Sequence, residues 1–210
     1  QVSLLHGKTD LNEKENISMR YWDYFCALES DLKKNSRYID FSDDNLNTHS
    51  IELTRLILSS CSEIDVILKE ICFELDDTHK PRKINEYQKI IKQELPNLIN
   101  EKINIGFSFT EVKPWDSWNK DKTPSWWTMH NSIKHQRSNY YKEANLDNSI
   151  KAVTALFICI NYYYKIVFSK SLKEKLNREV TWKDVTQILN SDINFLRFPS
   201  DYYISHLRVN

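Results

Sequence analysis

Residues 146–167 read LDNSIKAVTALFICINYYYKIV, and this stretch decides the fold. Large apolar side chains recur in it at alternating steps of four and three residues, the spacing of one helix face: Leu146, Ile150, Val153, Phe157, Ile160, Tyr164 and Val167. Most of the residues between them are apolar too, including Ala152, Ala155, Leu156, Ile158 and Cys159. A helix that is hydrophobic all round is buried on all sides. We therefore expect a helix over 146–169 at the centre of the fold.

Further helices are expected around this central one. Apolar spacing or a capping signal predicts them at 18–35, 49–76, 84–95 and 181–190. Residues 103–112 alternate instead between apolar and polar side chains, which predicts a small extended or β insertion, and the aromatic tail is a candidate to pair with it. We predict an all-α bundle of four or five core helices, more than about half helical, with at most one two-stranded sheet.

Composition limits both the fold and the function. The 210 residues include only two glycines and five prolines, which argues against sandwich and Rossmann-type folds. Lys plus Arg equals Asp plus Glu, 29 each, so nucleic-acid binding would require a local basic patch. The length suits one domain. We predict a loose arm at 1–15 and a single domain at 16–210, with its core at 18–168 and a C-terminal helix and aromatic tail at 170–210.

The four cysteines occur singly, each within an apolar helical run: Cys26, Cys61, Cys72 and Cys159. None forms the closely spaced pair of a zinc site, so we expect buried free thiols in a reducing cytosol, no metal and no cofactor. The longest apolar run, AVTALFICI, is shorter than the roughly 20 residues of a membrane span. These features predict a cytoplasmic protein that does not insert in a membrane.

Residues 124–137, PSWWTMHNSIKHQR, carry the densest chemistry of the chain. On a helical wheel of 126–144, one side collects Trp126, Met129, Ile133, Tyr140 and Ala144. The opposite half collects Trp127, His130, Asn131, Lys134, His135, Arg137, Ser138 and Tyr141. A solvated face usually mixes Glu with Lys, but residues 125–142 contain no acid. The cations of this face therefore favour an anionic partner, either an acidic side chain or phosphate.

Several residues of this face have the properties that metal-free RNA cleavage requires. His135 titrates near neutrality and could transfer a proton, with Asn131 orienting it or the phosphate. Lys134 and Arg137 could stabilise the charge that develops on the phosphorane. Trp127 and Tyr141 are suited to stacking on bases or to closing an interface.

Two carboxylates interrupt the apolar stripe of the 49–76 helix. Glu63 and Asp65 both flank positions that face the core. They are either ordinary boundary carboxylates or partners that pair with Lys134, Arg137 or a histidine of the motif helix. The sequence leaves both interpretations open.

The stretch SWWTMHNSIKHQRSNYYKEANLDNSIKAVTALF at 125–157 resembles a helix pair of bacterial proteins in the HEPN superfamily. The shared pattern is a tryptophan pair, then N-x-x-K-H-x-R, then an A-N-L-x-N helix start. SSCSEIDVILKEI at 59–71 resembles the acidic patch of the same proteins. The resemblance implies a HEPN-like helical bundle that dimerises through its motif helices. It also implies metal-independent ribonuclease activity in abortive infection, toxin–antitoxin or other antiviral defence systems.

One position departs from the ribonuclease signature of that superfamily. The signature is an arginine followed, after four to six intervening residues, by a histidine, and here Asn131 and His135 align with its polar residue and its histidine. His130 occupies the arginine position. We therefore keep two hypotheses: a metal-independent endoribonuclease or RNA-binding effector, and an inactive module that binds a protein or nucleotide partner as a sensor or scaffold. In both, a homodimer forms through residues 126–141, and a defence-system protein is a candidate partner.

Overall fold

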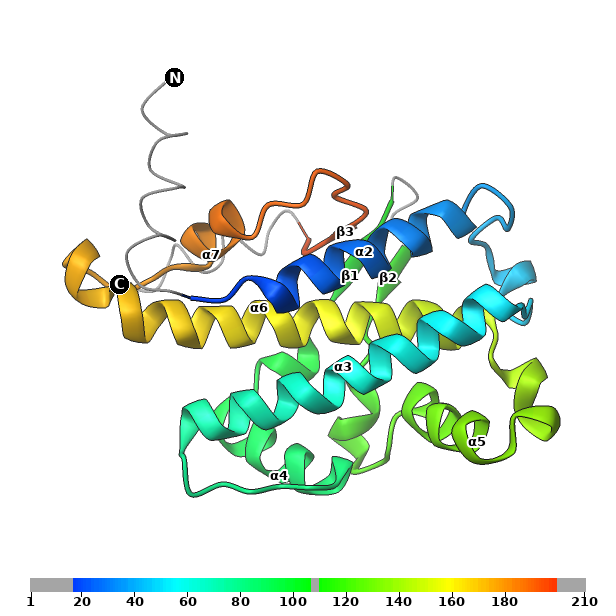
Figure 1. Cartoon of the computed structure of the whole chain (residues 1–210), viewed down its shortest axis with the longest axis horizontal. Helices are drawn as coiled ribbons and strands as arrows, with labels where there is room; N and C mark the ends of the chain where they lie inside the picture. The colour runs from blue at the N-terminus through cyan, green and yellow to red at the C-terminus, as the bar shows by residue number, and fades with distance from the viewer. Residues whose placement is uncertain (1–16, 107–109, 200–210) are drawn as a thin grey trace.

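The computed structural model describes residues 17–106 and 110–199, and helices account for 66% of it (Figure 1). The described part contains the α-helices α2 (Arg20–Asn35), α3 (Ile51–Leu75), α4 (Ile84–Glu94), α5 (Ser125–Tyr140), α6 (Leu146–Leu176) and α7 (Trp182–Ile188). All were predicted from the sequence, with most bounds within two residues, and the predicted mainly helical bundle is confirmed. The arm at 1–15, Phe107, Phe109 and the tail from residue 200 lie outside the described residues.

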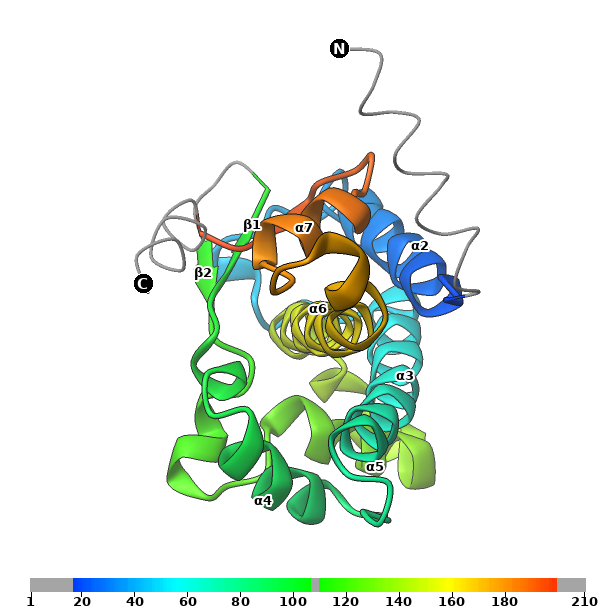
Figure 2. The same cartoon turned by 90° about the vertical axis from the view of Figure 1, so that its left-hand side faces the viewer.

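The helix α6 forms the axis of the molecule. Figure 1 shows α2 and α3 lying along α6, and Figure 2, which looks down α6, shows other elements on several of its sides. Its largest contact is with α3. Every residue from Ala152 to Tyr162 is buried, which is what a helix that is apolar all round requires.

Within the described residues, α6 is also the one helix long and apolar enough to cross a membrane. Its most apolar window, within Leu146–Leu172, has a mean hydropathy of 1.4, but 72% of that window is buried inside the protein. The surrounding helices thus already cover the surface that a membrane would otherwise contact. The burial is that of a core helix.

Three short strands form an antiparallel sheet beside the bundle. They are β1 (Ile103–Ile105), β2 (Thr110–Val112) and β3 (Leu196–Arg197), in the order β2-β1-β3. The prediction of at most one two-stranded sheet is wrong, because β3 in the C-terminal segment adds a third strand. Its pairing with β1 confirms the prediction that this segment pairs with the 103–112 insertion. At the end of β1, Gly106 has a φ of +57°, and a Cβ there would lie 3.0 Å from the Phe195 ring, so this turn requires glycine.

A buried carboxylate attaches this C-terminal segment to the first described helix. Glu29 of α2 is 1% exposed and accepts hydrogen bonds from Ser191 Oγ at 2.6 Å and from the backbone N–H groups of Phe195 at 2.9 Å and Leu196 at 2.8 Å. Three donors satisfy a group that is costly to bury alone. Glu29 therefore fixes the position of β3 against the helical bundle.

The predicted capping signal before α7 is confirmed. Thr181 Oγ1 accepts from the Asp184 N–H at 3.3 Å, and the Asp184 carboxylate accepts from the Thr181 N–H at 2.7 Å. Arg178 adds two further bonds to the same carboxylate, at 2.7 and 2.8 Å. These contacts fix the start of a helix that has only seven residues.

The cysteines are free thiols, as the sequence predicted. Cys61, Cys72 and Cys159 are buried, whereas Cys26 is half-buried. Burial raises the pKa of both Cys26 and Cys72 to about 11. Because the thiolate is the reactive form, these two thiols are poor nucleophiles near neutral pH.

Candidate functional site

A cluster of four tryptophans holds the first turns of α5. The ring centroids of Trp115 and Trp118 lie 4.3 Å apart. Those of Trp115 and Trp126 lie 4.9 Å apart, and those of Trp126 and Trp127 lie 6.0 Å apart. The Trp126 indole N–H also donates to the Pro114 carbonyl at 2.9 Å. Trp115 and Trp118 come from the loop before α5, so this loop and the helix form one aromatic core.

The tryptophan cluster contradicts part of the helical-wheel prediction. Trp127 is 8% exposed and His130 is 7% exposed, so the prediction that both face solvent is wrong. Trp127 lies between Trp126 and His130, and the ring centroids of Trp127 and His130 are 5.6 Å apart. A wheel predicts one buried face, but the tryptophan cluster buries this second side of α5 as well. Trp127 is therefore not available for stacking on a base.

His130 is buried and has an unsatisfied nitrogen. Its Nδ1 is buried and has no hydrogen-bond partner among residues 17–106 and 110–199. Burial lowers the pKa of His130, Lys134 and His135 lower it further, and only Asp65 acts in the opposite direction. The ordinary pKa of histidine is about 6.5, so His130 is a neutral imidazole at pH 7.

Four predicted residues remain on the surface: Asn131, Lys134, His135 and Arg137, which we call the α5 polar arc. All four side chains are exposed. Within the described part of the chain, none of them forms an ion pair or a side-chain hydrogen bond. Their charges and hydrogen-bonding groups are thus available to a ligand.

The helix geometry breaks within this surface. Gln136 has a φ of −143° and a ψ of 59°, outside the helical region, so a single wheel over 126–144 is wrong. Residues 134–139 are all exposed, so no buried side chain holds this turn in helical geometry. Because the break lies between His135 and Arg137, their relative direction does not follow from helical spacing.

The segment that follows α5 is fixed by contacts with the residues just before α3 and with the start of α6. The Tyr141 ring lies edge-on against the His49 ring, with centroids 5.6 Å apart, and His49 forms a β-bridge with Asn145. Asn148 of α6 donates to the Glu143 carbonyl at 3.0 Å. Tyr141, predicted as a binding residue, is half-buried in this contact.

The two carboxylates of the predicted acidic patch point in different directions. Asp65 accepts a hydrogen bond from Tyr87 of α4 at 2.9 Å and pairs with Lys69, and its charge also acts on His130. Glu63 is half-buried, burial raises its pKa, and its charge acts on Tyr21 of α2. Neither carboxylate forms an ion pair with α5 among the described residues.

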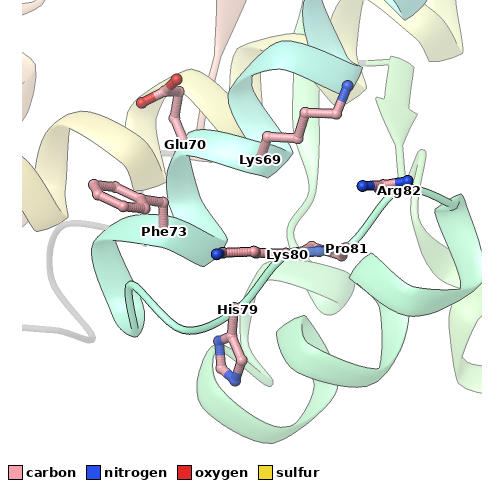
Figure 3. A pocket seen from close by; sticks show the side chains of 7 residues that line it. All are labelled: Lys69, Glu70, Phe73, His79, Lys80, Pro81 and Arg82. Atoms are coloured by element: carbon pink, nitrogen blue, oxygen red, sulfur yellow. The ribbon is translucent and has the colours of Figure 1, made fainter.

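A hollow that the sequence did not predict lies at the end of α3. It has a volume of about 480 Å³, and we call it the α3–α4 hollow (Figure 3). One wall comes from Lys69, Glu70 and Phe73 of α3, and the other from the loop residues Lys80, Pro81 and Arg82. The basic run HKPRK at 79–83 is visible in the sequence, but no local pattern shows that it lies beside Phe73.

The described residues contain no group of three or more histidine, cysteine, aspartate or glutamate side chains that could hold a metal ion. Comparisons of the chain with protein-family models, with curated proteins and with solved structures find no match. The function of this chain is therefore inferred from the surfaces described above.

Proposed function

We propose that the α5 polar arc binds the phosphate backbone of RNA. The observation that carries the proposal is the exposure of Lys134 and Arg137, beside Asn131 and His135, on a segment with no carboxylate from 125 to 142. Cations that have no acidic partner bind phosphate oxygens and release the counterions condensed on the nucleic acid. Amide and imidazole groups beside them add hydrogen bonds that orient the strand.

The attachment of α5 to the rest of the protein also favours binding at the α5 polar arc. The tryptophan cluster holds the first turns of α5, and the contacts of Tyr141 and Asn148 hold its far end. These contacts fix the segments on both sides of the arc and so reduce the conformational entropy lost on binding, although the turn at residues 134–139 has no buried side chain of its own. Because Trp127 and Tyr141 are engaged within the chain, we expect little base stacking, a weak sequence preference and a strong salt dependence.

Metal-independent cleavage is a second candidate function, favoured by the exposed imidazole of His135 beside Lys134. A base would remove the 2′-OH proton, the 2′-oxygen would attack phosphorus, and an acid would protonate the departing 5′-oxygen. The arc of one chain offers only His135 for these two roles, because His130 is buried. A two-fold dimer through α5 would bring a second His135 to the same phosphate.

The resemblance to the HEPN superfamily supports the same proposal and implies a cytoplasmic effector in phage defence or a toxin–antitoxin pair. An RNA-binding module without cleavage is the alternative within it. The observation that favours this alternative is His130, which supplies a buried neutral ring where the ribonuclease signature has an arginine.

Binding is tested by fluorescence anisotropy with a labelled single-stranded RNA at several salt concentrations. The double variant Lys134→Glu/Arg137→Glu should bind at least about tenfold more weakly, and the salt slope should fall by about one for each lost phosphate contact. Lys33→Glu, an exposed lysine of α2, serves as the matched control. Equal affinity of the double variant and the wild type would exclude the arc as the RNA site.

Cleavage is tested on the same RNA by resolving the products and their ends. If the dimer is a ribonuclease, His135→Ala should bind RNA but produce no 2′,3′-cyclic phosphate ends, and EDTA should not change the wild-type rate. Wild-type protein that binds RNA and leaves it uncut would favour the inactive module.

A further inference from the structure

The α3–α4 hollow combines cations, an exposed ring and a carboxylate around one space. Figure 3 shows Lys69 and Arg82 on one side of it, Glu70 and Phe73 on the other, and Lys80 between them. Its volume of about 480 Å³ is within the range of small-molecule sites, roughly 300–1,000 Å³. The hollow therefore has a cationic end and an aromatic end.

The cationic end has charge that the protein does not neutralise. Within residues 17–106 and 110–199, the side chains of Lys80 and Arg82 form no ion pair or hydrogen bond, and both are exposed. Lys69 forms an ion pair with Asp65. Figure 3 shows the Lys69 ammonium and the Arg82 guanidinium on the same side of the hollow, whereas the Lys80 ammonium points toward Phe73. An arginine fork beside an ammonium group is a chemical match for the oxygens of a phosphate group, and the long Lys80 side chain adds a third cation at the same hollow.

The loop that carries two of these cations is fixed by local hydrogen bonds. Asp76 accepts from the Thr78 N–H at 2.9 Å and from its hydroxyl at 2.6 Å, and the His79 N–H donates to the Asp76 carbonyl at 3.0 Å. Farther along, the Arg82 N–H donates to Glu86 at 2.6 Å, which leaves its guanidinium available. The backbone on both sides of Lys80 is thus positioned without a ligand.

The aromatic end provides a surface for a base. Phe73 is 55% exposed at this rim, although it lies on a helix whose other large apolar residues are mostly buried. An exposed phenylalanine ring stacks on any nucleobase, whatever its sequence. Glu70 beside it can accept hydrogen bonds from ribose hydroxyls or from an exocyclic amine of a base.

We propose that the α3–α4 hollow binds a nucleoside monophosphate group, with its phosphate at Lys69, Lys80 and Arg82 and its base on Phe73. The source of this group is either a free nucleotide or the phosphorylated end of an RNA strand, which present the same chemistry. The proposal does not rest on the function of the α5 polar arc, since the two sites share no residue.

Titration calorimetry of the full chain with AMP, adenosine and inorganic phosphate tests the proposal. Phe73→Ala should weaken AMP binding about tenfold and leave phosphate binding unchanged, whereas Phe73→Trp should retain AMP binding. Lys80→Ala/Arg82→Ala should weaken both AMP and phosphate binding by about ten- to a hundredfold. Tyr38→Ala and Lys33→Ala, which remove an exposed ring and an exposed cation elsewhere, should change neither.

The source of the group is resolved with RNA oligonucleotides that carry a 5′-phosphate or a 5′-hydroxyl. Tighter binding of the phosphorylated strand, lost in Lys80→Ala/Arg82→Ala and displaced by AMP, identifies an RNA end. AMP binding with no difference between the strands identifies a free nucleotide. The absence of AMP binding at millimolar concentration would overturn the proposal, as would AMP binding that none of the hollow variants alters.

Discussion

Glu29 shows how much one side chain contributes to this fold. Replacing it with alanine leaves the Ser191 hydroxyl and the N–H groups of Phe195 and Leu196 without their acceptor. Two of these three donor residues are buried, so we expect Glu29→Ala to lower the free energy of unfolding by about 3 kcal/mol. Glu29→Gln keeps one acceptor oxygen and should cost about 1 kcal/mol. Urea unfolding followed by circular dichroism measures both differences.

The matched control for this prediction is Asp192→Ala, an exposed carboxylate next to Ser191. It should change the free energy of unfolding by no more than about 0.5 kcal/mol. A Glu29→Ala variant as stable as this control would mean that the C-terminal segment is held by its apolar contacts alone.

At the scale of an element, α7 should lose stability in acid. The Arg178 guanidinium and the Thr181 donors hold the pKa of Asp184 well below its ordinary range, although burial acts in the opposite direction. A carboxyl group whose pKa is lower in the folded state stabilises that state above its unfolded pKa of about 3.9, and this contribution is lost as the pH falls further. Asp184→Asn should therefore destabilise α7 by about 1 kcal/mol at pH 7, and this difference should shrink below about pH 4.

Hydrogen exchange of the α7 amides measures this local stability in both proteins. Asp116→Asn, an exposed carboxylate of the loop before α5, is the control and should not change exchange in α7. A difference between Asp184→Asn and the wild type that is the same at pH 7 and pH 3 would contradict the ionic part of the explanation.

At the scale of the whole molecule, dimerisation and RNA binding should be linked. A two-fold axis beside α5 brings two copies of one cationic, acid-free surface together, so Lys134 and Arg137 repel their own copies. Salt screens this repulsion, and a bound RNA phosphate neutralises it. We therefore expect sedimentation velocity to show a larger dimer fraction with short RNA or at higher salt. A monomer under all of these conditions would remove the dimer, and with it the shared catalytic site, but not RNA binding.

The sequence predicted the long elements well because one physical rule dominates each of them. In α3 and α6 the apolar stripe is sustained over many turns, and burial of that stripe determines both the helix and its place in the core. The helical wheel correctly predicted that Ile133 and Met129 of α5 are buried, because they belong to the apolar stripe of that helix. It was wrong for Trp127 and His130, because the tryptophan cluster covers a second side of the helix.

Other features depend on contacts that no local pattern encodes. The break at Gln136 follows no glycine or proline. The aromatic tail was predicted to pair with the 103–112 insertion, but β3 has only two residues, too few to show from alternation where the strand lies. The α3–α4 hollow forms where a loop passes the last turns of α3, so its lining residues are separated in the sequence. The HKPRK run was visible, but the proximity of Phe73 to it was not.

The bonds of Glu29 also determine when this protein can finish folding as it is synthesised. The carboxylate and its most distant partner, Leu196, are 167 residues apart. A ribosome that adds about 5–20 residues per second needs roughly 10–30 s to cover that distance. Throughout this interval α2 can pack against α3, but its acidic side chain has none of its three partners. Until β3 is made, water is therefore the hydrogen-bond partner of the Glu29 carboxylate in place of the C-terminal segment, and β3 can join β1 only after that.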